Sequence, residues 1–419
     1  MRISTVTMFE QSTASMNRQQ SDLMKVSQQI ASGRRVVNPS DDPQAASRAV
    51  GVDQAKAVTE QYSDSRVSAR NSMSQTESIL NSISDAVTSA KTLLVQASSD
   101  TLTDANRESI ASELKGVYET MLGQANATDG SGRYLFGGYK DSEPPFAKDG
   151  NGSVQYKGDS NAREQRVDAT RLMPVADNGE TIFKSVPSGA GYVAEAKKDN
   201  GDLNQGNVTF RGPQINDVKN ATDFRITFND PANTFDVETF DGTNWVPADP
   251  ADPNLTGVEY KGNQDGSAQQ VSYSGISVNL EGTPVAGDSI LVAQADGEQR
   301  QPDLFRTMEE AIRVLENPAD DPVKKADQRN TLNTAMRDLD NSLDNVLTVR
   351  ASAGARLNEL DVIDAVGSNR MLNYDQTLSD LVDLDYTEAI SEYSLRQIGM
   401  QASQKAFVDI KGLSLFNYM

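Results

Sequence analysis

The 419-residue sequence contains no cysteine and no histidine. These absences exclude disulfides, thiolate nucleophiles, imidazole bases and most zinc sites. The missing cysteine fits either compositional drift or a protein that works outside the cell. No apolar run reaches the ~18 residues of a membrane span, so membrane insertion is not expected. The N-terminus also lacks the apolar segment of a Sec-type signal peptide.

Positive charge is scarce as well. The chain has 39 Lys and Arg against 60 Asp and Glu, a net charge of −21. Nucleic acid is therefore not an expected partner, because phosphate binding needs clustered cations. No phosphate-binding P-loop, nucleophile elbow or histidine-based metal motif is present. We accordingly expect a protein that is not an enzyme and that has no cofactor, no metal site and no catalytic residues.

Residues that break helices are rare in both flanks and gather in the middle of the chain. Of the 15 prolines, 11 lie between Pro144 and Pro302, and 21 of the 29 glycines lie between Gly130 and Gly297. The flanks are therefore predicted to be helical and the middle to be β-structure. We expect a mainly α protein with an inserted β-domain. Both flanks would build a long antiparallel rod or coiled coil, followed by a β-hairpin region and a separate, mostly antiparallel β-domain.

Both ends of the chain carry large apolar side chains at seven-residue spacing. Such spacing forms one narrow stripe along a helix, which another helix must cover. The sequence leaves open whether each end pairs with the other end, with a sister subunit, or with both. Residues 1–40 have a net charge of +3 and residues 380–419 of −3, which weakly favours pairing of the ends. The predicted assembly seam consists of Phe9, Met16, Leu23, Ile30, Tyr386, Tyr393, Met400 and Phe407.

The inner flanks repeat this pattern. Residues 44–99 and 323–366 are predicted to form long helices, the first of them ~80 Å long at 1.5 Å per residue. Thr103 and Asp303 can cap two shorter helices, and a last helical segment is expected from about Tyr374. The a and d positions predicted for the first long helix are Met73, Leu80, Val87 and Leu94 with Thr76, Ile83, Ala90 and Ala97.

Two six-residue segments, 38–43 and 317–322, are nearly identical. In each, an Asn suits a helix end and the following Pro prevents continuation. The second Asp can cap the next helix, whose first position the second Pro would occupy. Acid–base or metal chemistry at Asp41 and Asp42 is disfavoured, because no third ligand accompanies them. The predicted helix-breaking residues are Asn38, Pro39, Asp42, Pro43, Asn317, Pro318, Asp321 and Pro322.

The middle of the chain has two parts. Within residues 133–175, the signals of a hairpin are Tyr134–Phe136, followed by two glycines, and later Val154–Asp159. Residues 177–300 contain alternating strands and carry 19 acidic against 8 basic residues, a surface for solubility or for binding. The expected domains are a terminal helical assembly domain (1–42 and 374–419), a helical rod with a β-hairpin (43–176 and 301–373) and an outer β-domain (177–300).

Several short segments share the pattern of one family: Met1–Thr5, Ile30–Arg35, Asn38–Pro43, Gly132–Gly138, Tyr156–Asp159, Asp383–Ala389 and Leu413–Met419. Together they resemble the flagellin superfamily, and specifically its hook-associated protein 3 branch, the hook–filament junction proteins. The resemblance covers about residues 1–170 and 303–419. Residues 177–300 contribute little to it.

The resemblance implies a structural protein of the bacterial flagellum, located outside the cell at the hook–filament junction. It implies export through the flagellar type III apparatus without a cleaved signal peptide, and self-assembly through the terminal helices into a ring or short helical layer. The implied partners are further copies of the chain, hook-associated protein 1, flagellin and a cytoplasmic export chaperone. Two alternatives stay open: flagellin itself, the filament subunit, and a secreted coiled-coil adhesin or effector whose β-domain binds a ligand.

Overall fold

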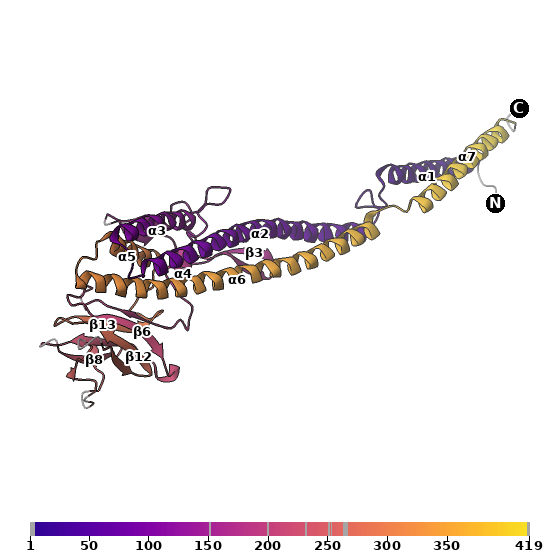
Figure 1. Ribbon diagram of the computed structural model, residues 1–419. Helices are drawn as coiled ribbons and strands as arrows, with labels where there is room; N and C mark the ends of the chain where they lie inside the picture. Colours follow the sequence, from indigo (N-terminus) through magenta and orange to yellow (C-terminus); the bar gives the residue numbers. More distant parts are fainter. Residues whose placement is uncertain are drawn as a thin grey trace. The chain divides into compact units, whose positions relative to one another are not determined.

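The computed structural model describes residues 5–150, 152–198, 201–230, 233–249, 252, 254–262 and 267–416. The first four and last three residues, which carry part of the family resemblance, lie outside this range. Helices form both flanks and strands fill the middle, as the proline distribution predicts (Figure 1). The helices are α1 (Thr5–Ser32), α2 (Pro43–Ala97), α3 (Asp104–Ala125), α4 (Gly179–Phe183), α5 (Leu304–Glu316), α6 (Pro322–Val382), α7 (Tyr386–Phe416) and the 3₁₀ turn η1 (Val218–Asn220).

The strands lie between α3 and α5. They are β1 (Phe146–Lys148), β2 (Val154–Tyr156), β3 (Arg163–Asp168), β4 (Arg171–Ala176), β5 (Tyr192–Glu195), β6 (Thr209–Ile215), β7 (Phe224–Phe228), β8 (Thr234–Phe240), β9 (Trp245–Pro247), β10 (Val258–Glu259), β11 (Gln269–Tyr273), β12 (Ile276–Glu281) and β13 (Ser289–Gln294). The chain divides into two compact units, Met1–Arg66 with Asp361–Met419, and Val67–Leu360. The long helices α2 and α6 contribute residues to both units.

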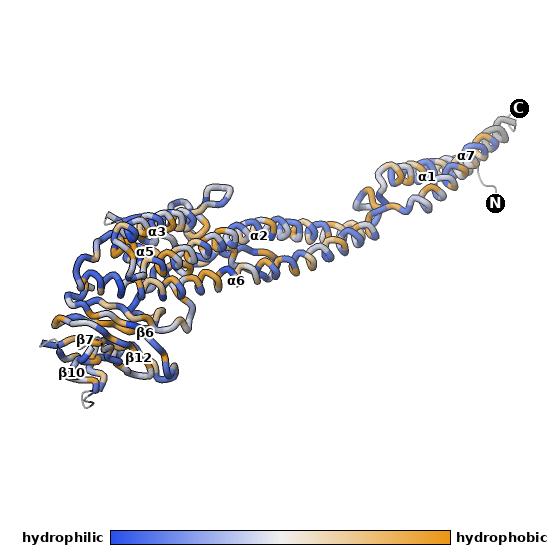
Figure 2. The backbone as a smooth tube through the Cα atoms, viewed as in Figure 1, coloured by the Kyte–Doolittle hydropathy of each residue, from blue (hydrophilic) through white to orange (hydrophobic). Residues whose placement is uncertain are grey.

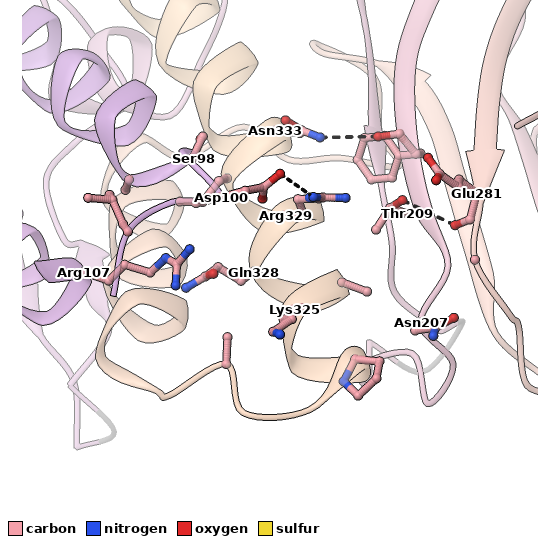
Figure 3. A pocket seen from close by; sticks show the side chains of 18 of the residues that line it. Ser98, Asp100, Arg107, Asn207, Thr209, Glu281, Lys325, Gln328, Arg329 and Asn333 are labelled. Carbon is pink, nitrogen blue, oxygen red and sulfur yellow. Dashed lines mark hydrogen bonds and ion pairs between the residues drawn. The ribbon is translucent and has the colours of Figure 1, made fainter. Parts of the chain in front are cut away.

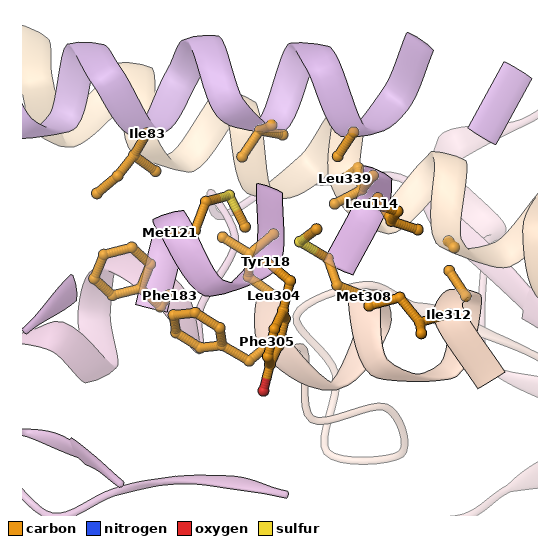
Figure 4. Close-up of a cluster of buried hydrophobic side chains, with 14 of the residues drawn as sticks. Ile83, Leu114, Tyr118, Met121, Phe183, Leu304, Phe305, Met308, Ile312 and Leu339 are labelled. Atoms are coloured by element: carbon orange, nitrogen blue, oxygen red, sulfur yellow. The ribbon is translucent and has the colours of Figure 1, made fainter. Parts of the chain in front are cut away.

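The helical part of the second unit has one core shared by α2, α3, α5 and α6. All eight a and d positions predicted for α2 are buried, which confirms its heptad pattern. Thr103 and Asp303 cap α3 and α5 by accepting from amides of the first turn. Figure 4 shows how side chains of α3 and α5, among them Tyr118 and Phe305, fill the space beside α2. The rings of Tyr118 and Phe305 meet edge to face, with centroids 6.1 Å apart.

Of the two segments expected in the hairpin, Val154–Tyr156 is a strand, β2, and pairs with β1, whereas Tyr134–Phe136 is not a strand. Tyr134 makes an isolated bridge with Thr128. The chain then folds back in a tight turn, in which the Lys140 amide donates to the Gly137 carbonyl at 3.2 Å. A Cβ on Gly137 would lie 2.4 Å from the Lys140 carbonyl oxygen, so this close backbone approach is possible only for glycine.

Two antiparallel sheets form the β-domain. The larger sheet has the strand order β10-β8-β7-β13-β5, with β9 paired to β8, and the smaller has the order β11-β12-β6. Side chains of both sheets share one core, which includes Phe224, Ile226 and Phe228 of β7 and Val278 and Leu280 of β12. The apolar positions of β7 alternate, as expected for a strand with one face in a core.

Hydrogen bonds to strand backbones fix the β-domain to α6. The side-chain oxygen of Asn330 accepts from the Phe210 amide at 3.1 Å, and its nitrogen donates to the Val208 carbonyl at 2.8 Å. Thr334, one helical turn further along α6, donates to the Ala194 carbonyl at 2.7 Å. These polar side chains satisfy backbone groups that would otherwise be buried without partners.

A buried ion cluster stands beside these hydrogen bonds. Arg300 is buried and pairs with Glu195 of β5 and Asp338 of α6. Burial raises the pKa of Asp338, because desolvation outweighs the neighbouring guanidinium. Burial acts on Glu195 as well, but the charges of Arg300 and Lys197 outweigh it and lower the pKa of that carboxyl. The cluster therefore links the β-domain to the helices. Breaking it is costly, because a buried charge would be left without a partner.

Candidate assembly interface

The helices α1 and α7 lie antiparallel and pack along each other within the first unit (Figure 1). Near one end of the pair, the rings of Phe9 and Phe407 have centroids 5.2 Å apart. In the middle, the Arg396 guanidinium lies 2.8 Å from a carboxylate oxygen of Asp22. These contacts fix the alignment of the two helices.

This alignment places the two predicted seams level with each other. Within the chain each end therefore pairs with the other, which is one of the possibilities that the sequence left open. Contacts of the same residues with sister subunits remain a prediction. Phe9 contacts Phe407, and steps of seven residues from this contact along antiparallel helices put Met16 level with Met400, Leu23 with Tyr393 and Ile30 with Tyr386.

The helix pair has very little core. Among the side chains that the structure describes in α1 and α7, only Val26 and Ala389 are buried. The seam residues are half-buried, apart from Phe9 and Tyr386, which are exposed. A core side chain in a stable domain touches neighbours on all sides. Two helices that share so few buried contacts are marginally stable as an isolated pair.

Several other large apolar side chains of the helix pair are exposed. Met24, Ile390, Leu395, Ile398 and Val408 are each more than half exposed, and we call this set the outer apolar residues. Hydrophobic positions alternate with hydrophilic ones along both helices (Figure 2). Several large exposed apolar side chains on one small unit are typical of an interaction surface. The seven-residue rows do not include these residues, and their only signal in the sequence is an apolar side chain outside the rows.

Short connections join this pair to the long helices. Gly33 follows α1 with φ +70°, a left-handed conformation that favours glycine. Its carbonyl accepts from the Leu384 amide at 3.0 Å, and the Arg35 amide donates to the Val382 carbonyl at 2.8 Å. The two connections therefore run side by side and are hydrogen-bonded to each other.

The break between α6 and α7 comes later than the sequence pattern suggests. The last helical segment was expected from about Tyr374, but α6 continues to Val382 and α7 begins at Tyr386. No proline or glycine lies between Tyr374 and Tyr386, so the break has no strong sequence signal. Asp385 caps α7 by accepting from the Thr387 amide at 2.8 Å.

The first of the two similar segments holds the turn between α1 and α2. A carboxylate oxygen of Asp41 accepts from the Asn38 amide at 2.9 Å, and the other lies 3.1 Å from the Lys25 ammonium. The Asn38 amide, followed by Lys25, lowers the pKa of Asp41. Asp42 caps α2 by accepting from the Ala45 amide at 3.0 Å, and this bond lowers the pKa of Asp42. Both carboxylates thus serve the turn, with Pro43 as the first residue of α2.

The second segment belongs to the other unit and starts its helix in the same way. Only here does the Asn stand at a helix end as predicted, because α1 already ends at Ser32, before Asn38. Asn317 follows α5 and donates to the Arg313 carbonyl at 2.7 Å. Asp321 accepts from the Lys324 amide at 2.8 Å, and Pro322 is the first residue of α6. The two segments therefore form two helix turns, one in each unit.

Within the described ranges, no helix is both long and apolar enough to cross a membrane. In the same part of the chain, no group of three or more acidic side chains is arranged to hold a metal ion.

The chain is similar to flagellar proteins in both sequence and structure. Residues 3–141 match the family model of the bacterial flagellin N-terminal helical region. The chain is 33% identical to flagellar hook-associated protein 3 of Escherichia coli strain K12, over 99% of both chains. The crystal structure of FlgL from Xanthomonas campestris matches with a TM-score of 0.63 at 26% identity, covering 78% of this chain and 99% of that one. Flagellar hook associated protein-3 from Legionella pneumophila matches with a TM-score of 0.65 at 25% identity, covering 79% and 98%. This chain belongs to the flagellar hook-associated protein 3 family.

Proposed function

We propose that this chain is a structural, non-enzymatic junction protein of the bacterial flagellum. It joins the hook, through hook-associated protein 1, to the flagellin filament. Support comes from the full-length similarity to flagellar hook-associated protein 3. The observation that carries the proposal is the α1–α7 pair, which buries few of its own apolar side chains and exposes several others.

The expected domains acquire roles in this proposal. Residues 1–42 and 374–419 assemble with the same residues of other copies into a ring or short helical layer. Residues 43–176 and 301–373 form the rod, and residues 177–300 form the outer β-domain. The chain leaves the cell by type III export without a cleaved signal peptide. A cytoplasmic chaperone that covers the exposed apolar side chains of α7 would prevent premature assembly.

The seam and the outer apolar residues have different tasks in this assembly. The seam, from Phe9 to Ile30 and from Tyr386 to Phe407, holds α1 to α7 in one copy. The outer apolar residues pack against helices of neighbouring copies. Full burial of one such side chain contributes about 1.5–3 kcal/mol. A few of them per subunit therefore stabilise a layer whose single helix pairs are marginal.

Complementation of a gene deletion tests this proposal. The deletion strain should retain hooks, lose attached filaments and shed flagellin into the medium. Wild-type protein should restore the filaments. Leu395→Asp should not restore them, because Leu395 is 70% exposed on α7 and would place a carboxylate in the apolar contact between copies.

The matched control is Gln404→Asp, which introduces the same charge at an exposed polar position of α7. It should restore filaments. Normal motility of the deletion strain would overturn the junction role. Full complementation by Leu395→Asp would instead overturn the assignment of the outer apolar residues. Recovery of the chain as the bulk filament protein would identify it as a flagellin.

A further inference from the structure

A cleft of about 1010 Å³ opens in the second unit (Figure 3). It lies between the start of α3, the first turns of α6 and the strands β6 and β12. Pockets that bind small molecules usually have volumes of about 300–1,000 Å³ and mostly apolar linings. This cleft is lined largely by polar and charged side chains, so its size and chemistry fit a short polar chain segment better than a compact apolar ligand.

Cations outnumber carboxylates around the cleft, although the whole chain has a net charge of −21. The four cations come from three separate elements, α3, β6 and α6, so the fold gathers them from distant parts of the sequence. The cations are Arg107, Arg211, Lys325 and Arg329, and the carboxylates are Asp100, Asp104 and Glu281.

The carboxylate of Asp100 faces the arginines of the cleft. Arg329 lies 2.8 Å from it and donates a hydrogen bond (Figure 3). This bond is the main reason why the pKa of Asp100 is lowered, and the charges of Arg329, Arg107 and Arg211 act in the same direction. Three guanidinium groups thus act on one carboxylate. Each of them also pairs with one carboxylate of the lining, so the excess positive charge of the cleft is that of Lys325.

Two cationic donors in the cleft have no acceptor among the residues that the structure describes. The Lys325 ammonium has no hydrogen-bond or ion-pair partner among the residues that the structure describes. The Nε of Arg107 is buried and has no acceptor there either, while its terminal nitrogens bind Asp104 and the Ser99 carbonyl. A buried donor without an acceptor is costly, so the site favours a ligand that brings one.

We propose that this cleft binds a carboxylate-rich segment of a second copy of this chain. Carboxylates are the acceptors that guanidinium and ammonium groups bind most strongly. The chain itself offers many of them, since residues 177–300 carry 19 acidic against 8 basic residues. Complementary charge on identical subunits directs how they meet. This inference rests on the proposed function, because copies lie side by side only in the assembled layer.

A titration of the purified full chain tests the cleft independently of assembly. Hexaglutamate should bind in low salt and hexaglutamine should not, and binding should weaken as salt rises. Lys325→Gln should weaken hexaglutamate binding about fivefold, as expected for one solvent-accessible ion pair. The matched control is Lys324→Gln, which removes the same charge from the neighbouring residue, outside the cleft lining. It should leave binding unchanged.

Absence of hexaglutamate binding would overturn the proposal, and so would equal losses in both lysine variants, since the attraction would then be unspecific. A photoreactive amino acid introduced at Lys325 tests the occupant in intact flagella. Cross-links to residues 177–300 of a second copy support the proposal. Cross-links only to another protein or to a polysaccharide overturn it. A chain that binds hexaglutamate but is missing from flagella would refute the junction role and not the cleft.

Discussion

Single residues decide where α1 ends and where α2 and α7 begin. Gly33 ends α1 because its left-handed conformation turns the chain away from the helix axis. Asp42 and Asp385 start α2 and α7 by accepting amide protons of the first turn. Because each of these residues acts through its own backbone geometry or a local hydrogen bond, each can be tested by one substitution.

Gly33→Ala should loosen the two hydrogen-bonded connections. The left-handed conformation costs a residue with a Cβ about 1–2 kcal/mol, and that Cβ would lie 3.0 Å from the Tyr386 hydroxyl. Amide hydrogen exchange at Arg35 and Leu384 should therefore accelerate about tenfold, the factor that ~1.4 kcal/mol produces. Gly51→Ala is the control, since Gly51 lies within α2 and its added Cβ would meet nothing within 4 Å. Equal acceleration in both variants would contradict this role of Gly33.

Acid should release the turn between α1 and α2. The folded pKa of Asp41 and of Asp42 lies below the ordinary value of 3.8. Their stabilisation is therefore complete above pH 3.8 and is lost as the pH falls through the folded pKa. Amide resonances of Asn38 and Ala45 should titrate with midpoints below 3.8. Asp41→Asn should abolish the titration of the Asn38 amide. A midpoint at or above pH 3.8 in the wild type would contradict the hydrogen bonds of Asp41 and Asp42 in this turn.

At the scale of elements, polar side chains of α6 join helix and sheet. The sequence predicts the existence of α6 from its heptads, although not its end, and the strands from their alternation, because each pattern is local. Asn330 and Thr334 gave no signal in the sequence, since a polar residue on a helix usually faces solvent. They are buried because strand backbones need their hydrogen bonds.

Asn330→Leu should destabilise the β-domain on α6. The substitution leaves the Phe210 amide and the Val208 carbonyl buried without partners, which costs about 2–4 kcal/mol for the two groups. The fluorescence of Trp245, the single tryptophan, would report a lower midpoint of urea unfolding. Asn333→Leu is the comparison, because Asn333 is half-buried and makes one longer bond, 3.3 Å, to the Phe210 carbonyl. Equal losses in the two variants would argue against the special role of Asn330.

At the scale of the whole molecule, the terminal helices combine an inner seam with the outer apolar residues. The proposed assembly requires both, and substitutions in them should separate two functions. The seam keeps α1 and α7 together in one copy, whereas the outer apolar residues act between copies. A seam variant should therefore be detectable in the isolated monomer, and an outer variant only in the assembled structure.

Met400→Asp should weaken the α1–α7 pair in the purified monomer, because Met400 is half-buried and level with Met16. A loss on the order of 1 kcal/mol is expected for a partly buried position, seen as faster amide exchange along α7. Ile398→Asp should leave the exchange unchanged, since Ile398 is exposed, yet it should block filament attachment. Identical exchange in both variants would contradict the division into a seam and an outer surface.

Predictions from the sequence succeeded where a feature depends on local spacing, and failed where it depends on contacts with other segments. The order of helices and strands and the burial of Met73 and Leu94 followed from local spacing. The end of α6 was misplaced, because Val382 is followed by no helix breaker and the turn is held by bonds to Gly33 and Arg35. The sequence also named Tyr134–Phe136 as part of a hairpin, but Tyr134 bridges to Thr128, and the strand that pairs with β2 is β1, later in the chain.

By itself the sequence determined the class of fold, the two proline-bounded turns and the family, because periodicity, capping and shared motifs are properties of short segments. Tertiary structure alone decided that Phe9 meets Phe407 and that Met16 lies level with Met400. It also decided that Leu395 stays exposed and that four cations of distant segments share one cleft. A heptad pattern specifies that a helix needs a partner, but the identity and alignment of that partner depend on residues hundreds of positions away.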